Sequence, residues 1–228
     1  MPEFQLEDIS LSVPSKDVGE RVLRALAKGH FERDEARAMR AHFGPDDRLL
    51  DLGSGTGFIA TIAGRIAGGE AVTGVEALPH MVDIAKANLV RNGVQGARIL
   101  WGAVVPPSFE GAQVRYRARR QFWASSVLST ATEQRGRQMD VPALRLDTLL
   151  EMSRATVISC DIEGGELALF EAELPQKVRL IILEIHPGRY GDAGTARIFG
   201  ALAQNNMVYC ARRSVGATVV FRRIGTGT

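Results

Sequence analysis

The chain has 228 residues, of which 45% are hydrophobic and 24% are charged, and its formal net charge is +2. This length suffices for one complete hydrophobic core, and the composition excludes a disordered chain. The small net charge gives no reason to expect a nucleic-acid or membrane partner, and apolar runs such as 180–185 are too short to span a membrane.

The start of the chain, MPEFQLEDIS, lacks the basic and apolar regions of a secretion signal. The cysteines are Cys160 and Cys210, and Cys160 falls in a predicted buried strand, where it acts as a small hydrophobic residue. We therefore expect a cytoplasmic protein and a single domain over residues 1–228. The oligomeric state stays open, and a homo-oligomer is compatible with the sequence.

Helices are predicted throughout the N-terminal part, residues 1–46. Val22, Leu23 and Leu26 are apolar at helical spacing before Gly29, and a second helix is expected over about 33–43.

Strands and helices then alternate. Short apolar runs predict strands, with helices between them, and a hairpin is expected at the end of the chain. Five apolar strands separated by helices indicate an α/β fold whose mostly parallel sheet has helices on both faces. The expected strands are 48–53, 71–78, 97–105, 156–164 and 178–188, and the expected helices are 58–67, one from Pro79, 165–173 and 194–204.

The alternation breaks over residues 106–147, which begin with two prolines and show no clear helix. Alternating residues in QVRYRARRQFW indicate strands. We interpret this segment as a β-rich insertion above the carboxyl edge of the sheet, where open α/β folds bind ligands.

The strongest motif is DLGSGTGF, residues 51–58, in which a strand leads through glycines into a helix. The glycine spacing is G-x-G-x-G, whereas the dinucleotide fingerprint would require a third glycine where Phe58 stands. Asp51 suits a cationic group such as the amino group of methionine better than a pyrophosphate. The candidate cofactor residues of this loop are Asp51, Gly53, Ser54, Gly55, Gly57 and Phe58.

A carboxylate follows at the end of the next strand. Glu76 stands 25 residues after Asp51, where an acid accepts hydrogen bonds from the hydroxyls of a ribose. A ribose and a methionine amino group together indicate S-adenosylmethionine as the cofactor. Ala77 and Leu78 adjoin Glu76, and Gly102 and Ala103 at the following strand end are expected to flank the adenine, with Trp101 as an apolar neighbour.

Acids and a histidine gather at the fourth and fifth strand ends. Asp161 and Glu163 follow one strand, Glu184 and His186 the other, and neighbouring strand ends should bring them together. Histidine is the natural base near neutral pH, so Asp161, Glu163 and His186 are the candidate catalytic residues. Two alternatives stay open. His186 packs without a chemical role, or the cluster holds Mg²⁺ or Mn²⁺, which the spacing does not favour.

Arginines and aromatic residues alternate in the insertion. Arg115, Arg117 and Arg119 share one face of a predicted strand, with Arg120, Tyr116, Phe122 and Trp123 among them. This face is either solvated or attracts an anionic substrate, and a similar pattern binds single-stranded nucleic acid. The near-neutral chain makes a nucleic-acid partner the less favoured interpretation.

The combined motifs resemble the FkbM family of methyltransferases. The resemblance rests on DLGSGTGF, Glu76, LRLDTLL (144–150), DIEGGE (161–166) and LEIHP (183–187), and it covers roughly residues 28–190. It implies a Rossmann-like class I methyltransferase fold with a seven-stranded sheet and an antiparallel last strand. It also implies S-adenosylmethionine and the O-methylation of sugars or small natural products. Family loops often read D-x-G-A-N-x-G, and Ser54 and Thr56 depart from that pattern.

The resemblance also assigns residues. Asp51, Gly53, Gly55, Glu76 and Ala103 match cofactor positions, Asp161 and Glu163 match the acidic block, and Ser125 and Ser126 match a serine pair that adds Ser126 to the cofactor candidates. The segment 29–39 resembles a helix that precedes this fold, from which Glu32 reaches the methionine end. We expect a methyltransferase for a hydroxyl of a small molecule, with a nucleic-acid methyltransferase or a non-catalytic cofactor-binding subunit as alternatives.

Overall fold

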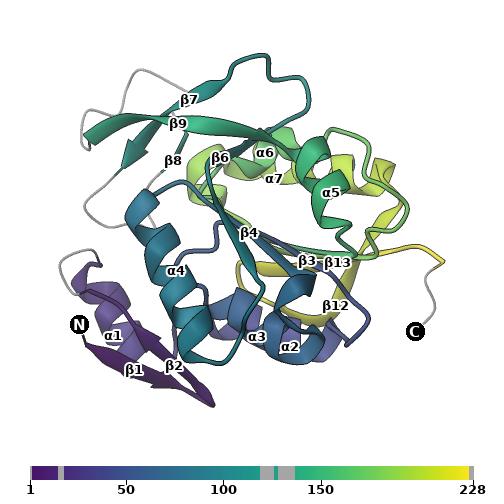
Figure 1. Cartoon of the computed structure of the whole chain (residues 1–228). Coiled ribbons are helices and arrows are strands. Elements are labelled where there is room, and N and C mark those ends of the chain that lie inside the picture. Colours follow the sequence, from purple (N-terminus) through teal and green to yellow (C-terminus); the bar gives the residue numbers. More distant parts are fainter. Residues whose placement is uncertain (1, 15–17, 119–125, 128–136, 226–228) are drawn as a thin grey trace.

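The central sheet has the strand order β12-β13-β11-β10-β3-β4-β5 in a computed structural model that describes residues 2–14, 18–118, 126–127 and 137–225 (Figure 1). Neighbours from β11 to β5 pair in parallel, and β13 is antiparallel to β11. This confirms the expected mostly parallel sheet with an antiparallel last strand. The strands are β3 (Leu49–Leu52), β4 (Val72–Glu76), β5 (Arg98–Trp101), β10 (Val157–Cys160), β11 (Leu180–Glu184), β12 (Met207–Val215) and β13 (Thr218–Arg223).

Helices cover both faces of this sheet because its strands are apolar on both sides. In β3, Leu49 joins one hydrophobic cluster and Leu50 the other, and Val157 and Ile158 of β10 divide in the same way. Each fully buried aliphatic side chain contributes about 1.5–3 kcal/mol. One face carries α1 (Glu20–Ala27), α2 (Arg33–His42), α3 (Phe58–Ala67) and α4 (Pro79–Arg91), and the other carries α5 (Leu146–Ser153), α6 (Glu166–Leu169) and α7 (Pro187–Gln204).

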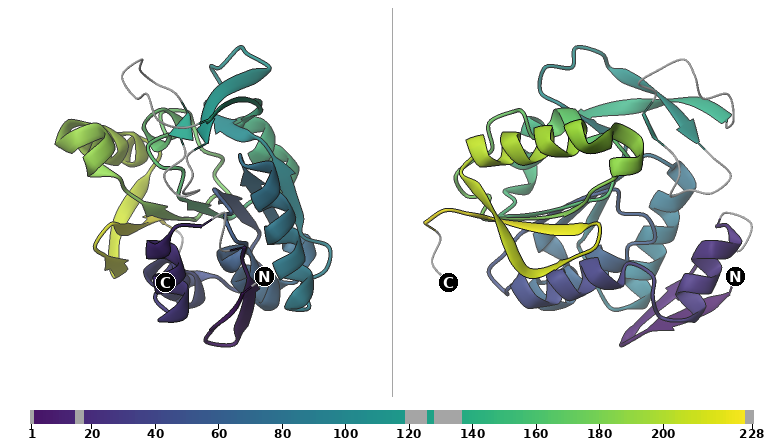
Figure 2. Two further views of the ribbon diagram at one scale, coloured as in Figure 1. Left: turned by 90° about the vertical axis from the view of Figure 1, so that its left-hand side faces the viewer. Right: turned by 180° about the vertical axis from the view of Figure 1, so that it is seen from behind.

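The N-terminal part is not purely helical, so that expectation for residues 1–46 was wrong in part. A hairpin of β1 (Glu3–Leu6) and β2 (Ile9–Ser12) precedes α1. Leu6, Ile9 and Leu11 are buried against the helices. Ile9 and Leu11 are two residues apart in β2, which is the spacing typical of a strand with one buried face. The side chains of Asn88 in α4 and of Asn92, the residue after α4, accept hydrogen bonds from the backbone of β2 and hold it there. Figure 2 shows the hairpin packed beside α1 near the N-terminus.

The insertion forms a second sheet, of order β6-β9-β7-β8, above α4 and the β5 edge (Figure 1). The strand expected over 97–105 divides at Gly102, because the chain leaves the central sheet there to pair with β9. A Cβ at Gly102 would lie 2.5 Å from Leu144 of β9. Val114 and Tyr116 are buried while Arg115 is exposed, as the alternation predicted. The strands are β6 (Ala103–Val105), β7 (Gln113–Ala118), β8 (Ser126–Val127) and β9 (Arg137–Arg145).

Several helix boundaries differ from expectation. The last residues of the insertion begin α5, although the sequence showed no clear helix there. The helix expected over 165–173 is the short α6, and α7 begins at Pro187 instead of 194, with a break at Gly191, where φ is 67°. Proline at a first helical position explains the early start of α7. Within the described residues, no helix has the length and apolar character needed to span a membrane.

Candidate active site

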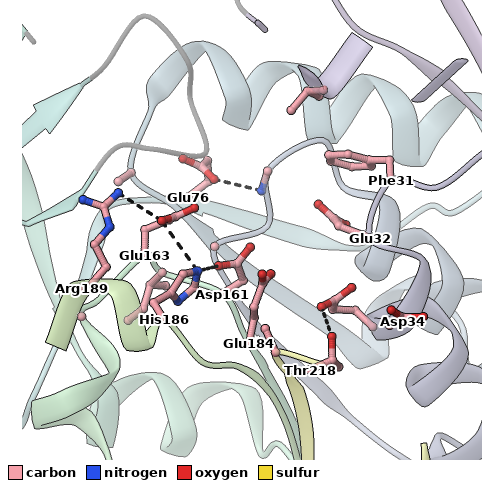
Figure 3. A pocket seen from close by; sticks show the side chains of 18 of the residues that line it. Phe31, Glu32, Asp34, Glu76, Asp161, Glu163, Glu184, His186, Arg189 and Thr218 are labelled. Atoms are coloured by element: carbon pink, nitrogen blue, oxygen red, sulfur yellow. Dashed lines mark hydrogen bonds and ion pairs between the residues drawn. The ribbon is translucent and has the colours of Figure 1, made fainter. Parts of the chain in front are cut away.

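A cavity of about 700 Å³ opens at the carboxyl ends of β3, β4, β10 and β11 (Figure 3). Its volume is in the range of small-molecule sites. The segment before α2 and the turn between β12 and β13 complete its wall. Of the predicted site residues, those in the wall are Glu32, Gly53, Gly55, Glu76, Ala77, Gly102, Ala103, Asp161, Glu163 and His186.

The glycine loop closes one side of the cavity. Gly53, Gly55 and Gly57 have φ values of 85°, 50° and 81°, in the left-handed region that favours glycine. A Cβ at Gly53 would lie 1.9 Å from the carbonyl oxygen of Asp161. The loop therefore depends on glycine both for its turn and for its close approach to the end of β10.

Glu76 faces the cavity from the end of β4. Its Oε2 accepts a hydrogen bond from the Gly55 N–H at 2.9 Å, and its Oε1 accepts one from the Leu78 N–H at 2.8 Å (Figure 3). Burial raises the pKa of Glu76, and the backbone N–H groups of Leu78, Gly55 and Ala77 oppose that rise. Each carboxylate oxygen retains a second lone pair, so this side chain can accept hydrogen bonds from two ligand hydroxyls.

Asp51 lies behind the loop and not in the cavity wall. Only 3% of the residue is exposed, and its Oδ2 has no hydrogen-bond partner among the described residues. Burial raises its pKa to about 6, with a smaller contribution from the charge of Glu76, against hydrogen bonds from Ser54 and Ser159. A cationic group near the loop would favour the ionised form of this side chain.

The raised pKa of Asp51 predicts that it makes the folded state less stable as pH rises. The pKa of Asp51 is near its ordinary value of 3.8 in the unfolded chain and about 6 in the folded chain, so the folded state binds the extra proton between these pH values. The free energy of unfolding should therefore fall by on the order of 3 kcal/mol between pH 4 and pH 7. Asp51→Asn should abolish this pH-dependent contribution to the free energy of unfolding. The melting temperature of the variant should therefore increase relative to that of the wild type as the pH rises from 4 to 7.

A difference in melting temperature that is constant from pH 4 to pH 7 would contradict this assignment. Because every other titrating group is common to both proteins, its contribution cancels in the comparison. Asp192→Asn, on the exposed surface of α7, is the matched control, and its difference from wild type should stay constant.

The part of the cavity where the adenine is expected contains some of the predicted residues and some that were not predicted. Ala77, Gly102 and Ala103 line the cavity, but Leu78 and Trp101 do not. Leu78 is buried in the core beneath the second sheet, and Trp101 donates its Nε1–H to the carbonyl of Ala77 at 3.0 Å. The apolar surface of the cavity here comes instead from Val104 and from Tyr116 of the insertion.

The remaining loop candidates support the site from behind. The Ser54 hydroxyl donates to the Asp51 carbonyl at 3.1 Å, and Gly57 packs against Ala85 of α4. Phe58 is buried, with its ring centroid 6.5 Å from that of Phe31. The side chain of Ser126 lies outside the described residues, as do Ser125 and the part of the arginine pattern beyond residue 118.

His186 lies at the centre of the acidic cluster. Its Nε2 is 3.4 Å from Asp161 Oδ1 and 3.7 Å from Glu163 Oε2, and the side chains converge in Figure 3. The strand β10 ends at Cys160, so strand alternation does not position these acids. Instead Glu163 adopts a left-handed backbone, with φ at 55°, which turns its side chain toward the histidine. The predicted meeting of the two strand ends is present, and Glu184 lines the same cavity as Asp161, Glu163 and His186.

The other ring nitrogen of His186 contacts the carboxylate of Glu166, the first residue of α6. Glu166 is fully buried, and its Oε1 lies 3.1 Å from His186 Nδ1. Burial alone would lower the pKa of His186, but the hydrogen bond and charge of Glu166, with the charges of Glu163 and Glu184, raise it overall. The same Glu166 oxygen accepts a bond from the Ile162 N–H. This carboxylate therefore fixes the ring so that Nε2 faces the cavity.

Three carboxyl groups crowd the far side of the cavity. Glu32, Asp161 and Glu184 each have a raised pKa, and burial is the first cause for all three. Glu32 begins α2 with a left-handed φ of 47°, and Figure 3 shows it facing the same space as Asp161 and Glu184. A cavity with this charge distribution favours a cationic group, and the sulfonium and ammonium groups of S-adenosylmethionine have that character.

Sequence reasoning missed several residues of the wall. Arg21, Tyr116, Arg189 and Thr218 line the cavity from four separate elements. Arg189 donates to Glu163 at 3.3 Å, and the Thr218 hydroxyl donates to Glu35 across the opening. The buried face of QVRYRA was a usable signal for Tyr116. The other three depend on long-range packing that no local pattern reports.

Solved structures with the same architecture include methyltransferases. One is the precorrin-6y C5,15-methyltransferase of Geobacter metallireducens, with a TM-score of 0.50, 10% identity, and coverage of 95% of this chain and 96% of that one. Another is the tRNA (uracil-54, C5)-methyltransferase of Pyrococcus abyssi, with a TM-score of 0.51, 11% identity, and coverage of 97% and 42%. At these identities the likeness shows the fold alone, and the fold is that of a class I methyltransferase.

The sequence itself identifies the family. Residues 51–209 match the methyltransferase FkbM domain. The chain therefore belongs to the FkbM methyltransferase family, as its motifs indicated. It is also 40% identical over 82 residues to the ribosomal protein L11 methyltransferase of Thermus thermophilus, but the match covers 35% of this chain and 31% of that relative. The chain thus matches about a third of that relative's length.

Proposed function

We propose that this chain is an S-adenosylmethionine-dependent O-methyltransferase acting on a hydroxyl group of a small molecule. The observation that carries the proposal is one continuous cavity with two chemically different ends. The glycine loop and Glu76 form the end suited to a nucleoside, and Asp161 with His186 forms the end suited to an acceptor hydroxyl.

At the nucleoside end, the free lone pairs of Glu76 accept hydrogen bonds from the ribose hydroxyls. Gly53 and Gly55 let the ligand approach the loop backbone, since neither has a side chain. Ala77, Ala103 and Tyr116 flank the base, and Glu32 faces the methionine end. These assignments are supported by the backbone hydrogen bonds that hold the Glu76 carboxylate at the cavity wall.

At the acceptor end, the neutral form of His186 takes the proton of the hydroxyl through Nε2. Glu166 holds the ring through Nδ1, and Asp161 lies 3.4 Å from Nε2, where its carboxylate stabilises the protonated ring that forms. When bound, S-adenosylmethionine supplies a methyl group on a sulfonium, so the new O–C bond forms as the S–C bond breaks. The sulfonium charge is lost, and the acceptor proton resides on His186 until it exchanges with solvent.

The acceptor class rests on the cavity, because the substrates of the three similar proteins are not carried over to this chain. Two arginines of the insertion with described side chains each lie beside an acid: Arg115 is 3.7 Å from Asp140, and Arg145 is 2.6 Å from Asp147. These contacts leave less positive charge for a nucleic-acid partner. The experiment is transfer of a labelled methyl group from S-adenosylmethionine to a panel of hydroxylated small molecules, with RNA and ribosomal protein in parallel. Label on a small-molecule oxygen supports the proposal, and label confined to RNA or protein contradicts it.

Replacing Glu76 should weaken cofactor binding strongly. Glu76→Ala removes both acceptors for the ribose hydroxyls, and hydrogen bonds to a charged group contribute about 1.5–3 kcal/mol each. The dissociation constant for S-adenosylhomocysteine, measured by calorimetry, should rise on the order of a hundredfold. Glu151→Ala, on the exposed side of α5, should leave it unchanged. Equal affinities for the two variants would remove Glu76 from the site.

A further inference from the structure

Three electron-pair donors converge at one point of the acceptor end. They are Asp161 Oδ1, Glu163 Oε2 and His186 Nε2, and all lie within 4.8 Å of one another. Asp161 Oδ1 is buried without a hydrogen-bond partner among the described residues. A buried oxygen in that state costs free energy unless something fills the space before it.

The orientation of His186 sharpens this observation. Its Nδ1 lies 3.1 Å from Glu166 Oε1, so its Nε2 is turned toward Asp161 Oδ1 and Glu163 Oε2. Two carboxylate oxygens and one imidazole nitrogen therefore converge on one point, which is a donor set that divalent cations use.

We propose that Asp161, Glu163 and His186 bind a divalent cation at this point. Metal–ligand distances near 2.1 Å let two ligand atoms of one ion lie up to about 4.2 Å apart. The contacts of 3.4 Å and 3.7 Å to Nε2 satisfy that limit, and the remaining oxygen pair needs at most a small side-chain rotation. Two carboxylates with one imidazole suit Mn²⁺, and Mg²⁺ less well, because Mg²⁺ prefers oxygen throughout.

The surroundings match those of a metal ligand. A ligating histidine commonly donates its other ring N–H to a carboxylate, which fixes its orientation, and the fully buried Glu166 occupies that position. Glu163 is held in a left-handed backbone, which costs of order 1–3 kcal/mol and aims its carboxylate at the ion. Arg189 contacts the same Glu163 oxygen from the outer side, so the ion would share that oxygen.

This inference rests on the proposed function for its purpose, and it changes one role there. With the ion present, Nε2 is a ligand, and the ion lowers the pKa of a coordinated acceptor hydroxyl in place of the imidazole base. Asp161 then orients the acceptor through the ion. The rest of the proposed site, including the glycine loop and Glu76, is unaffected.

The test is Mn²⁺ binding to the full chain after removal of metals with a chelator, followed by calorimetry and electron paramagnetic resonance. We expect one Mn²⁺ per chain and a spin-echo signal from a coordinated imidazole nitrogen. Glu163→Gln should weaken binding at least tenfold, and His186→Gln should also abolish the nitrogen signal. Glu35→Gln is the matched control, since Glu35 lines the same cavity outside the cluster, and it should change the affinity less than about twofold.

Absence of Mn²⁺ binding, or equal affinity in wild type, Glu163→Gln and His186→Gln, would overturn the proposal. Binding of S-adenosylhomocysteine to each variant in chelator shows whether the variant is folded and keeps the nucleoside end. Mn²⁺ binding at the cluster in a protein that binds no S-adenosylhomocysteine would refute the proposed function and leave the metal site standing. The two proposals therefore fail separately.

Discussion

His186→Ala lowers the rate of methyl transfer by roughly two to four powers of ten, while the affinity for S-adenosylmethionine stays within about twofold. The size of the loss is that expected when a general base is removed. The histidine lies at the acceptor end, beyond Asp161 from the glycine loop, so the nucleoside end keeps its contacts. Single-turnover kinetics and calorimetry of the same protein measure the two quantities.

A matched control is His80→Ala, because His80 is exposed on α4, outside the cavity wall. It should leave both quantities unchanged. Turnover of His186→Ala at the wild-type rate would exclude the residue from the chemistry, whether as a base or as a metal ligand. Loss of cofactor affinity together with rate would instead show that the two ends of the cavity are not independent.

Gly53→Ala should disable the protein through the loop itself. The alanine would occupy a left-handed backbone, with φ at 85°, and its Cβ would meet the Asp161 carbonyl oxygen at 1.9 Å. Relief requires the loop and the end of β10 to separate, which costs on the order of 3–5 kcal/mol. The melting temperature should fall by roughly 10 °C, and binding of S-adenosylhomocysteine should be lost.

Gly200→Ala provides the comparison for this substitution. Gly200 lies on the exposed side of α7, and an added Cβ there meets nothing within 4 Å. Because alanine favours a helix by about 0.5–1 kcal/mol over glycine, that variant should melt at or slightly above the wild-type temperature. If Gly53→Ala had the same melting temperature as Gly200→Ala and bound the cofactor normally, the close approach of loop and strand would not be important for stability or binding.

The strand ends were predictable because their signals are local. Asp51 and Glu76 each end a short apolar run, and the parallel arrangement of such runs brings their carboxyl ends to one edge. The same argument predicted that Asp161 and His186 lie close together. Asp161 and Glu163, however, lie in the turn after β10, so the alternation of side chains along the strand does not apply to them. Family motifs at these positions reinforced the prediction, and the match to the FkbM domain confirms the family.

Other features could not be obtained from local patterns. The β1–β2 hairpin had a usable alternation in Leu6, Ile9 and Leu11, but its position depends on Asn88 and Asn92, some eighty residues away. Thr218 reaches the cavity only because the β12–β13 turn folds back over the opening. Glu166 likewise gains His186 as a partner only because β11 pairs with β10.

The third predicted strand divides into β5 and β6 at Gly102, and the apolar pattern of the sequence did not predict this division. Residues 97–105 are continuously apolar enough to form one strand, yet Gly102 lets the chain turn out of the central sheet. The absence of a side chain there makes room for Leu144. That turn carries β6 to β9 and brings Tyr116 to the cavity, so one glycine decides which residues line this side of the cavity.

The central claim is that the cavity at the carboxyl edge of the sheet binds S-adenosylmethionine and not a dinucleotide. Calorimetric titration of the full chain with S-adenosylmethionine and, separately, with NAD tests it most directly. The glycine spacing, Glu76 and the acidic far wall predict binding of one S-adenosylmethionine per chain, with NAD weaker by at least a hundredfold. Preferential binding of NAD would contradict the account.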